Sequence, residues 1–177
     1  MPFPPENVGD RLHEGVLLTP WLSDYNADKA PTREATAGKT KEMALAGSGL
    51  PLKVVIADDS QAVAEMLKEL VSEAGRIEVV GMAETGPATI EAIRSLGPDA
   101  VLLDLQFRTG SGTDVIRAVR ADPALAATRL IVTSNHTSPQ LRAGCMELGA
   151  DAYFDKVKEL GALSEKLRGL AEEKARA

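Results

Sequence analysis

Short apolar runs alternate with amphipathic segments between residues 52 and 172, and this alternation is the main structural signal in the chain. Each amphipathic segment repeats apolar residues at helical spacing, as Val63, Leu67, Leu70 and Val71 do. The apolar runs predict five strands, over residues 52–57, 77–83, 100–105, 130–133 and 152–154. Strands that alternate with helices at this spacing predict an α/β fold: a doubly wound, five-stranded parallel sheet with helices on both faces.

Local residues predict where several helices begin and end. Asp59 or Ser60 can cap the first helix, and Gly75 can end it. Ser138 is followed by a proline, which suits the first turn of the fourth helix. The segment Gly110–Gly112 predicts a flexible loop after the third strand. These signals divide residues 51–175 into the elements of one domain.

Residues 1–50 have a different composition from the rest of the chain. They contain many small and polar residues, and one weak apolar patch lies around Trp21. This segment offers too little apolar area to offset the entropy of ordering, so we expect a disordered N-terminal extension. A short partner-binding motif around Trp21 is the alternative.

Composition narrows the class of protein. The chain is 44% hydrophobic but only 3% aromatic, which fits a sheet of aliphatic parallel strands. The formal net charge of −6 argues against a surface that binds DNA. The single cysteine, Cys145, lies on an apolar helix face, which indicates a small core residue. No apolar run approaches the length that spans a membrane and the N-terminus does not resemble a secretory signal, so we expect a cytoplasmic protein.

Polar residues follow four of the five predicted strands. Asp58 and Asp59 follow the first strand, and Asp104 lies at the end of the third, where Val101–Leu105 is otherwise apolar. Ser134 follows the fourth strand and Lys156 the fifth. Since parallel strands end at the same edge of the sheet, we expect these side chains to converge.

Three close carboxylates repel one another unless a cation lies among them. Ligation by oxygen alone, with no His or Cys, favours a hard ion such as Mg²⁺. A lysine and a hydroxyl beside that ion suit an anion with several oxygens, such as a phosphoryl group. The combination predicts an aspartate nucleophile surrounded by groups that stabilise charge, as phosphoryl transfer needs.

From residue 52 to about residue 172, the chain resembles the receiver domains of two-component response regulators. Ser134 follows Asp104 by 30 residues and Lys156 follows Ser134 by 22, which is similar to the spacing in that family. The resemblance implies a flavodoxin-like (βα)5 fold with strand order 2-1-3-4-5. It also implies that Asp104 accepts a phosphoryl group from a histidine kinase or a phosphotransfer protein.

The resemblance implies a role for each matching residue. Asp58, Asp59 and Asp104, with the backbone carbonyl of Gln106, would hold Mg²⁺. Lys156 would pair with the acceptor carboxylate and then with the phosphoryl group. Ser134 and Tyr153 would be the switch residues, one moving toward the phosphoryl group and the other swinging inward.

Some positions leave alternatives open. Val157 stands where the family usually has proline, so we expect a different shape for the loop after Lys156. Thr133 adjoins Ser134, and alternation along the strand favours Ser134 as the switch hydroxyl. His136 suits a solvated loop position, but His136 or Gln106 could also control the access of water to the acyl phosphate. The alternative for Tyr153 is an edge-strand aromatic residue without a switch role.

We therefore expect a stand-alone receiver that is not an enzyme beyond its own phosphoryl transfer and dephosphorylation. Phosphorylation would change the affinity of a face formed within residues 138–172 for a partner protein or a second copy, by a shift in population. One alternative is a degenerate receiver that binds partners without phosphorylation. A less favoured alternative is a flavin- or small-molecule-binding protein of the same topology, whose phosphate cradle Asp58 and Asp59 would oppose.

Overall fold

The computed structural model describes residues 49–177, except residues 74 and 137. The predicted disordered extension, apart from Gly49 and Leu50, and the motif around Trp21 lie outside the described residues. Among the described residues, five strands alternate with five helices. In chain order these elements are β1 (Leu52–Ala57), α2 (Gln61–Val71), β2 (Ile77–Ala83), α3 (Gly86–Leu96), β3 (Ala100–Asp104), α4 (Gly112–Ala121), β4 (Arg129–Ser134), α5 (Pro139–Glu147), β5 (Ala152–Asp155) and α6 (Leu160–Arg176).

The strands form one parallel sheet in the order β2-β1-β3-β4-β5. This order confirms the predicted flavodoxin-like topology. The central strand β3 is buried at every residue, Asp104 included, which explains its unbroken apolar sequence up to that carboxylate. The register places Asp104 beside Thr133 of β4 and Leu103 beside Ala57 of β1. The carboxyl ends of β1, β3 and β4 therefore lie next to one another.

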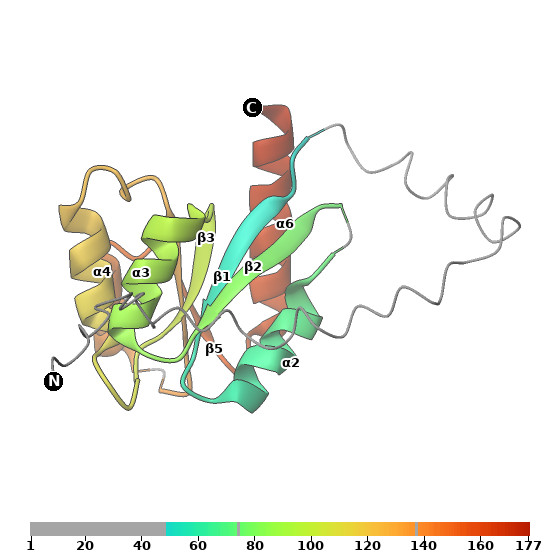
Figure 1. The fold of residues 1–177 in the computed structure, drawn as a ribbon. Coiled ribbons are helices and arrows are strands. Elements are labelled where there is room, and N and C mark those ends of the chain that lie inside the picture. Colours follow the sequence, from blue (N-terminus) through green and yellow to red (C-terminus); the bar gives the residue numbers. More distant parts are fainter. Residues whose placement is uncertain (1–48, 74, 137) are drawn as a thin grey trace, which may run out of the picture. The chain divides into compact units, whose positions relative to one another are not determined.

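Helices cover both faces of the sheet, as the alternation predicts. In Figure 1, α3 and α4 lie on one side of the sheet, and α2 and α6 lie on the other. Residues of α3, α4 and α5, such as Ile93, Ile116 and Cys145, pack on one face. Residues of α2 and α6, such as Leu67 and Leu167, pack on the opposite face. The placement of Cys145 in the core confirms the prediction from the sequence.

Two helix ends differ from the prediction. Ser60 occupies the N-cap of α2, but its side chain makes no capping hydrogen bond. Its backbone N–H donates to Asp58 Oδ1 at 3.0 Å. The helix α2 ends at Val71, and Gly75, at φ 78°, lies in the turn that leads to β2. By contrast, the Ser138 hydroxyl does cap α5 by accepting from the Leu141 N–H at 3.1 Å.

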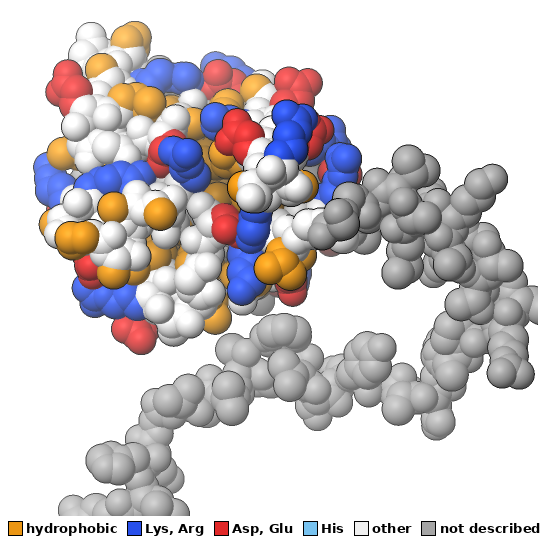
Figure 2. Space-filling view, turned by 90° about the horizontal axis from the view of Figure 1, so that it is seen from above, with side chains coloured by type: hydrophobic (Ala, Val, Ile, Leu, Met, Phe, Trp, Pro, Cys, Tyr) orange, Lys and Arg blue, Asp and Glu red, His pale blue; other side chains and the backbone are white. Residues whose placement is uncertain are grey.

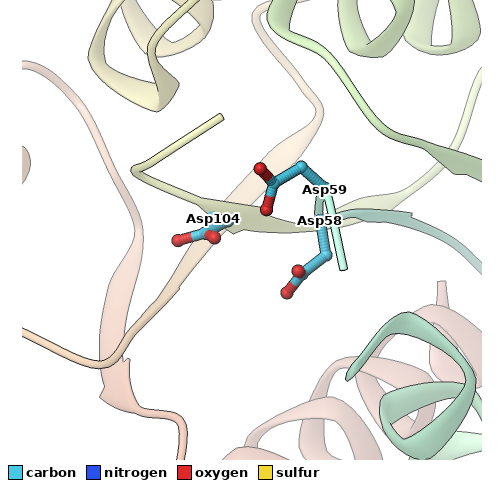
Figure 3. A group of neighbouring side chains, drawn as sticks. All are labelled: Asp58, Asp59 and Asp104. Carbon is cyan, nitrogen blue, oxygen red and sulfur yellow. The ribbon is translucent and has the colours of Figure 1, made fainter. Parts of the chain in front are cut away.

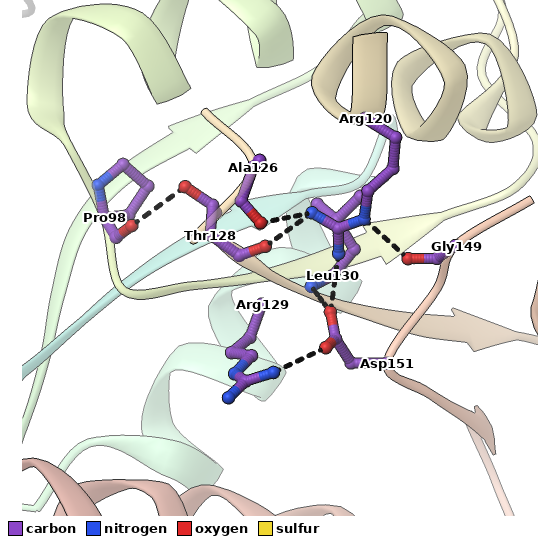
Figure 4. Close-up of polar contacts among 8 residues, drawn as sticks. All are labelled: Pro98, Arg120, Ala126, Thr128, Arg129, Leu130, Gly149 and Asp151. Atoms are coloured by element: carbon purple, nitrogen blue, oxygen red, sulfur yellow. Dashed lines mark hydrogen bonds and ion pairs between the residues drawn. The ribbon is translucent and has the colours of Figure 1, made fainter. Parts of the chain in front are cut away.

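Arg120 of α4 contacts the segments that lead into β4 and β5, at the end of the sheet opposite the carboxyl ends of the strands (Figure 4). Its guanidinium donates to the backbone carbonyls of Gly149, Ala126 and Thr128 at 2.8–3.1 Å. It also forms a 2.7 Å ion pair with Asp151, whose Oδ2 accepts from a backbone N–H of β4 as well. One side chain thus ties α4 to the loops that enter β4 and β5.

Charged side chains of both signs lie close together on the face of the described unit shown in Figure 2. Many charged side chains of the described residues form ion pairs, such as Lys174 with Asp99 at 2.6 Å and Arg129 with Asp151 at 3.0 Å. Among the described residues, none of the helices combines the length and the apolar character needed to cross a membrane.

Candidate functional site

Three carboxylates meet where β1 and β3 end (Figure 3). Asp58 and Asp59 directly follow β1, and Asp104 is the last residue of the neighbouring strand β3. Each of the three offers an oxygen that lies within 4.8 Å of the other two. The convergence expected from the shared polarity of parallel strands is therefore present.

Lys156 reaches two of these carboxylates from the residue after β5. Its Nζ lies 2.6 Å from Asp58 Oδ2 and 2.9 Å from Asp104 Oδ2. The Lys156 side chain is only 5% exposed, and those of Asp58 and Asp104 are 2% and 11% exposed. Buried charges of this kind are tolerable only when they are paired, so the three groups depend on one another.

Backbone N–H groups fix the direction of two carboxylates. Asp58 Oδ1 accepts from the Ser60 N–H at 3.0 Å, and Asp104 Oδ1 accepts from the Gln106 N–H at 3.3 Å. Each carboxylate thus uses one oxygen for a nearby N–H and the other for Lys156. The Gln106 side chain is exposed, and its residue bridges to Ser111 across the loop after β3.

The third carboxylate, Asp59, has a different partner. Its Oδ2 accepts from the Arg108 N–H at 3.1 Å, and the Arg108 Nε lies 3.5 Å from the same oxygen. The Arg108 Nη2 also donates to the Asp59 backbone oxygen at 3.2 Å. Asp59 is 25% exposed in its side chain and lies nearer to solvent than Asp58.

The donor set fits a hard divalent cation. All three candidate ligands are carboxylates, and carboxylate oxygens are the ligands that Mg²⁺ prefers in proteins. The positive charge that the described residues bring to the three carboxylates comes from Lys156 and Arg108, which leaves a formal excess of one negative charge. The site can therefore accept a cation both by chemistry and by charge.

The two adjacent hydroxyls at the end of β4 differ in their surroundings. Both side chains are buried. The Ser134 oxygen accepts from the His136 N–H at 3.1 Å, whereas Thr133 Oγ1 has no hydrogen-bond partner among the described residues. Alternation places Ser134 on the sheet face of Val132, where Tyr153 also packs. The choice of Ser134 over Thr133 as the switch residue stays a prediction.

Tyr153 belongs to the edge strand β5, but its side chain is buried in the core. It is 3% exposed, and its hydroxyl donates to the His136 carbonyl. Burial raises the pKa of the Tyr153 phenol above its usual value, and the hydroxyl of Ser134 partly opposes that rise. The Arg142 guanidinium lies 5.1 Å from the centre of the ring and forms a 2.8 Å ion pair with Glu159. Tyr153 therefore connects the end of β4 to the surface of α5 and α6.

The loop after Lys156 uses the backbone N–H that proline would lack. The Val157 N–H donates to Asp155 Oδ1 at 2.8 Å, and the Lys158 N–H donates to the same oxygen at 2.9 Å. The peptide bond before Val157 is trans, as are all peptide bonds of the described residues. Lys156 is thus held by a turn that Asp155 closes, and the Val157 side chain is 75% exposed.

Sequence reasoning missed Arg108 and misread Gly112. The segment Gly110–Gly112 was expected to be a flexible loop, but Gly112 is buried and begins α4. A Cβ at Gly112 would lie 2.2 Å from the Asp104 carbonyl oxygen, so only glycine fits there. The available signal was a glycine at the start of the helix that follows the Asp104 strand. Arg108 offered no signal, because its contact with Asp59 spans 49 residues of sequence.

The sequence is similar to those of known proteins over most of the described residues. The family model for the response regulator receiver domain matches residues 54–168. The nitrate/nitrite response regulator protein homolog of Haemophilus influenzae is 30% identical over 68% of this chain and 57% of its own length. Protein-glutamate methylesterase/protein-glutamine glutaminase 5 of Myxococcus xanthus is 32% identical, over 60% of this chain.

The fold is also similar to that of a solved structure. The signal receiver domain of the putative response regulator NarL from Mycobacterium tuberculosis is 28% identical, with a TM-score of 0.63 over 70% of this chain and 98% of that one. The chain spans about 30% of the length of the methylesterase relatives. The likeness to those proteins is therefore a likeness to one part of each.

Proposed function

We propose a function from one premise: the chain belongs to the family of response regulator receiver domains, and as such is a signalling domain of a two-component system. The proposal is that Asp104 accepts a phosphoryl group from the phosphohistidine of a histidine kinase or a phosphotransfer protein. The observation that carries it is the pairing of Asp104 with Lys156 inside a cluster of three carboxylates. We further propose that this occurs in the cytoplasm and involves neither DNA nor a membrane.

The transfer is a displacement at phosphorus. An oxygen of Asp104 forms a bond to phosphorus, the bond from phosphorus to the donor imidazole nitrogen breaks, and its electron pair stays on that nitrogen. Lys156, 2.9 Å from Asp104 Oδ2, holds the carboxylate in place and balances negative charge on the incoming group. The Gln106 N–H fixes the other oxygen and so limits rotation of the carboxylate.

In the proposal, Asp58, Asp59, Asp104 and the Gln106 carbonyl hold Mg²⁺. When bound, the ion neutralises negative charge on the phosphoryl oxygens and helps to align the reacting groups. Asp58 is already fixed by the Ser60 N–H and by Lys156, so its carboxylate needs little reorganisation to act as a ligand.

Ser134 and Tyr153 would carry the signal to the surface. The His136 backbone joins them, since its N–H donates to Ser134 and its carbonyl accepts from Tyr153. A movement of Ser134 toward the phosphoryl group would disturb both bonds and, through Tyr153, the Arg142–Glu159 ion pair. We propose that the face within residues 138–172 then binds a protein partner or a second copy with a different affinity.

Intact-mass measurement tests the proposal. The protein is incubated with Mg²⁺ and a small phosphodonor, and the wild type is compared with Asp104→Ala. The expected result is the labile gain of one phosphoryl group in the wild type and none in the variant. Asp114→Ala is the matched control, because Asp114 is an exposed aspartate of α4 whose only described ion pair is with Arg117. Phosphorylation of Asp104→Ala to the wild-type level would refute the assignment.

The same experiment distinguishes a phosphoacceptor from the alternative, a receiver that binds partners without phosphorylation. That alternative predicts no mass gain in the wild type, although the protein would remain folded. The trans turn at Val157 is the feature that favours it, because it replaces the proline usual in the family. The ion pairs that place Lys156 against both carboxylates favour the phosphoacceptor instead.

A further inference from the structure

We propose that Arg108 competes with a divalent cation for Asp59 and thereby lowers the affinity of the acidic site for Mg²⁺. The inference rests on the proposed function, since it takes the three aspartates to be cation ligands. The contact has three parts: the Arg108 N–H and Nε both reach Asp59 Oδ2, at 3.1 and 3.5 Å, and Nη2 donates to the Asp59 backbone oxygen at 3.2 Å.

Arg108 changes the charge that an entering cation meets. Lys156 pairs with Asp58 and Asp104 but forms no ion pair with Asp59 among the described contacts, and that place is taken by Arg108. The three carboxylates and two basic groups have a formal charge of −1, and removal of the arginine would make it −2. A divalent cation is attracted more strongly to the second arrangement and is no longer repelled by a neighbouring guanidinium.

The loop holds the Arg108 backbone, whereas the Arg108 side chain lies mostly in water. The Gly112 N–H donates to the Leu105 carbonyl at 3.0 Å, and the Gly86 N–H donates to the Thr109 carbonyl at 3.1 Å, so the loop is tied on both sides of Arg108. The Arg108 side chain is 82% exposed. The guanidinium can therefore leave Asp59 for water at little cost when a cation arrives, while the backbone N–H remains in place.

The exposure of Arg108 limits its effect on the affinity for Mg²⁺. The guanidinium is exposed and its interaction with the site is partly screened by water and salt. Loss of its charge should therefore tighten Mg²⁺ binding by about three- to tenfold at low ionic strength. The gain should shrink as NaCl is added, since the Debye length falls from about 30 Å at 0.01 M to about 10 Å at 0.1 M.

Isothermal titration of Mg²⁺ into the unphosphorylated full chain measures this affinity directly. Arg108→Gln removes the charge and keeps the backbone N–H, and Arg108→Lys keeps the charge. We expect Arg108→Gln to bind Mg²⁺ about three- to tenfold more tightly than the wild type, and Arg108→Lys to stay near the wild type. Arg117→Gln, an exposed arginine of α4 paired with Asp114, is the matched control and should leave the affinity unchanged.

The outcomes distinguish this inference from the function on which it rests. If the wild type binds Mg²⁺ and Arg108→Gln binds it no more tightly, the inference fails and the proposed cation site stands. It also fails if Arg108→Lys gains as much affinity as Arg108→Gln, or if Arg117→Gln gains equally. A wild type that binds no Mg²⁺ overturns the proposed cation site and this inference together.

Discussion

Replacement of Arg120 by alanine should lower the free energy of unfolding by about 2–4 kcal/mol. The guanidinium donates to three backbone carbonyls and pairs with Asp151 at 2.7 Å. Both side chains of the ion pair are largely buried, at 23% and 21% exposure, so water screens the pair less than it screens a surface pair. The substitution removes all four contacts at once.

The size of this loss in unfolding free energy depends on the partners that remain for the groups Arg120 contacts. The bonds to the Gly149 and Thr128 carbonyls are half-buried and the bond to Ala126 is exposed, so water replaces the lost donors only in part. Each lost hydrogen bond therefore costs about 0.5–1 kcal/mol. Asp151 keeps Arg129 and the Leu130 N–H as partners, so its charge is not left without compensation. The four contacts together therefore give about 2–4 kcal/mol, somewhat less than the cost of breaking a fully buried pair.

Urea unfolding followed by circular dichroism measures this difference. The midpoint should fall while the dependence on urea stays the same, because the surface exposed on unfolding is nearly unchanged. Arg117→Ala is the matched control on the same helix, and its exposed pair with Asp114 should contribute at most about 0.5 kcal/mol. If both variants unfolded at the same urea concentration, the reasoning about the Arg120 contacts would be refuted.

Two further substitutions test the interior. Gly112→Ala should destabilise the protein by about 1–3 kcal/mol in urea, since its Cβ would meet the Asp104 carbonyl oxygen; Gly169→Ala, with open space around it in α6, should be neutral or stabilising. The raised pKa of the Tyr153 phenol means that the unfolded chain ionises first, so this group's stabilisation is complete below about pH 10 and is lost as pH rises through the folded pKa. Tyr153→Phe should lose less stability than the wild type as the pH rises above the ordinary phenol pKa of about 10, and equal losses would contradict the burial argument.

The sequence was sufficient for the architecture because the signal is repeated throughout residues 52–172. Five apolar runs, each followed by a helical stripe, predict a parallel sheet whatever the details of each loop. Capping was less predictable. Ser60 has the right type and place for a side-chain cap, but its hydroxyl accepts no hydrogen bond from the first turn of α2. Whether a serine hydroxyl caps a helix depends on its rotamer, which the local sequence does not determine.

The candidate site was likewise predictable from the sequence only in part. The convergence of Asp58, Asp104 and Lys156 follows from strand polarity, which the sequence determines. The partner of Asp59 depends on the path of the loop after β3, and one of the bonds that hold this loop joins Thr109 to Gly86, a contact that no local pattern encodes. Sequence reasoning could therefore find residues at strand ends but not a loop residue that reaches them.

The two basic residues of the site differ in burial: Lys156 is buried and Arg108 is exposed. Lys156 is buried between two buried carboxylates, so its departure would leave both without their shared partner. Arg108 is exposed and binds the most exposed carboxylate, so it can be displaced at little cost. An entering cation should therefore displace Arg108 and leave Lys156 in place. The inner pairing that orients Asp104 for phosphoryl transfer would then persist with or without the ion.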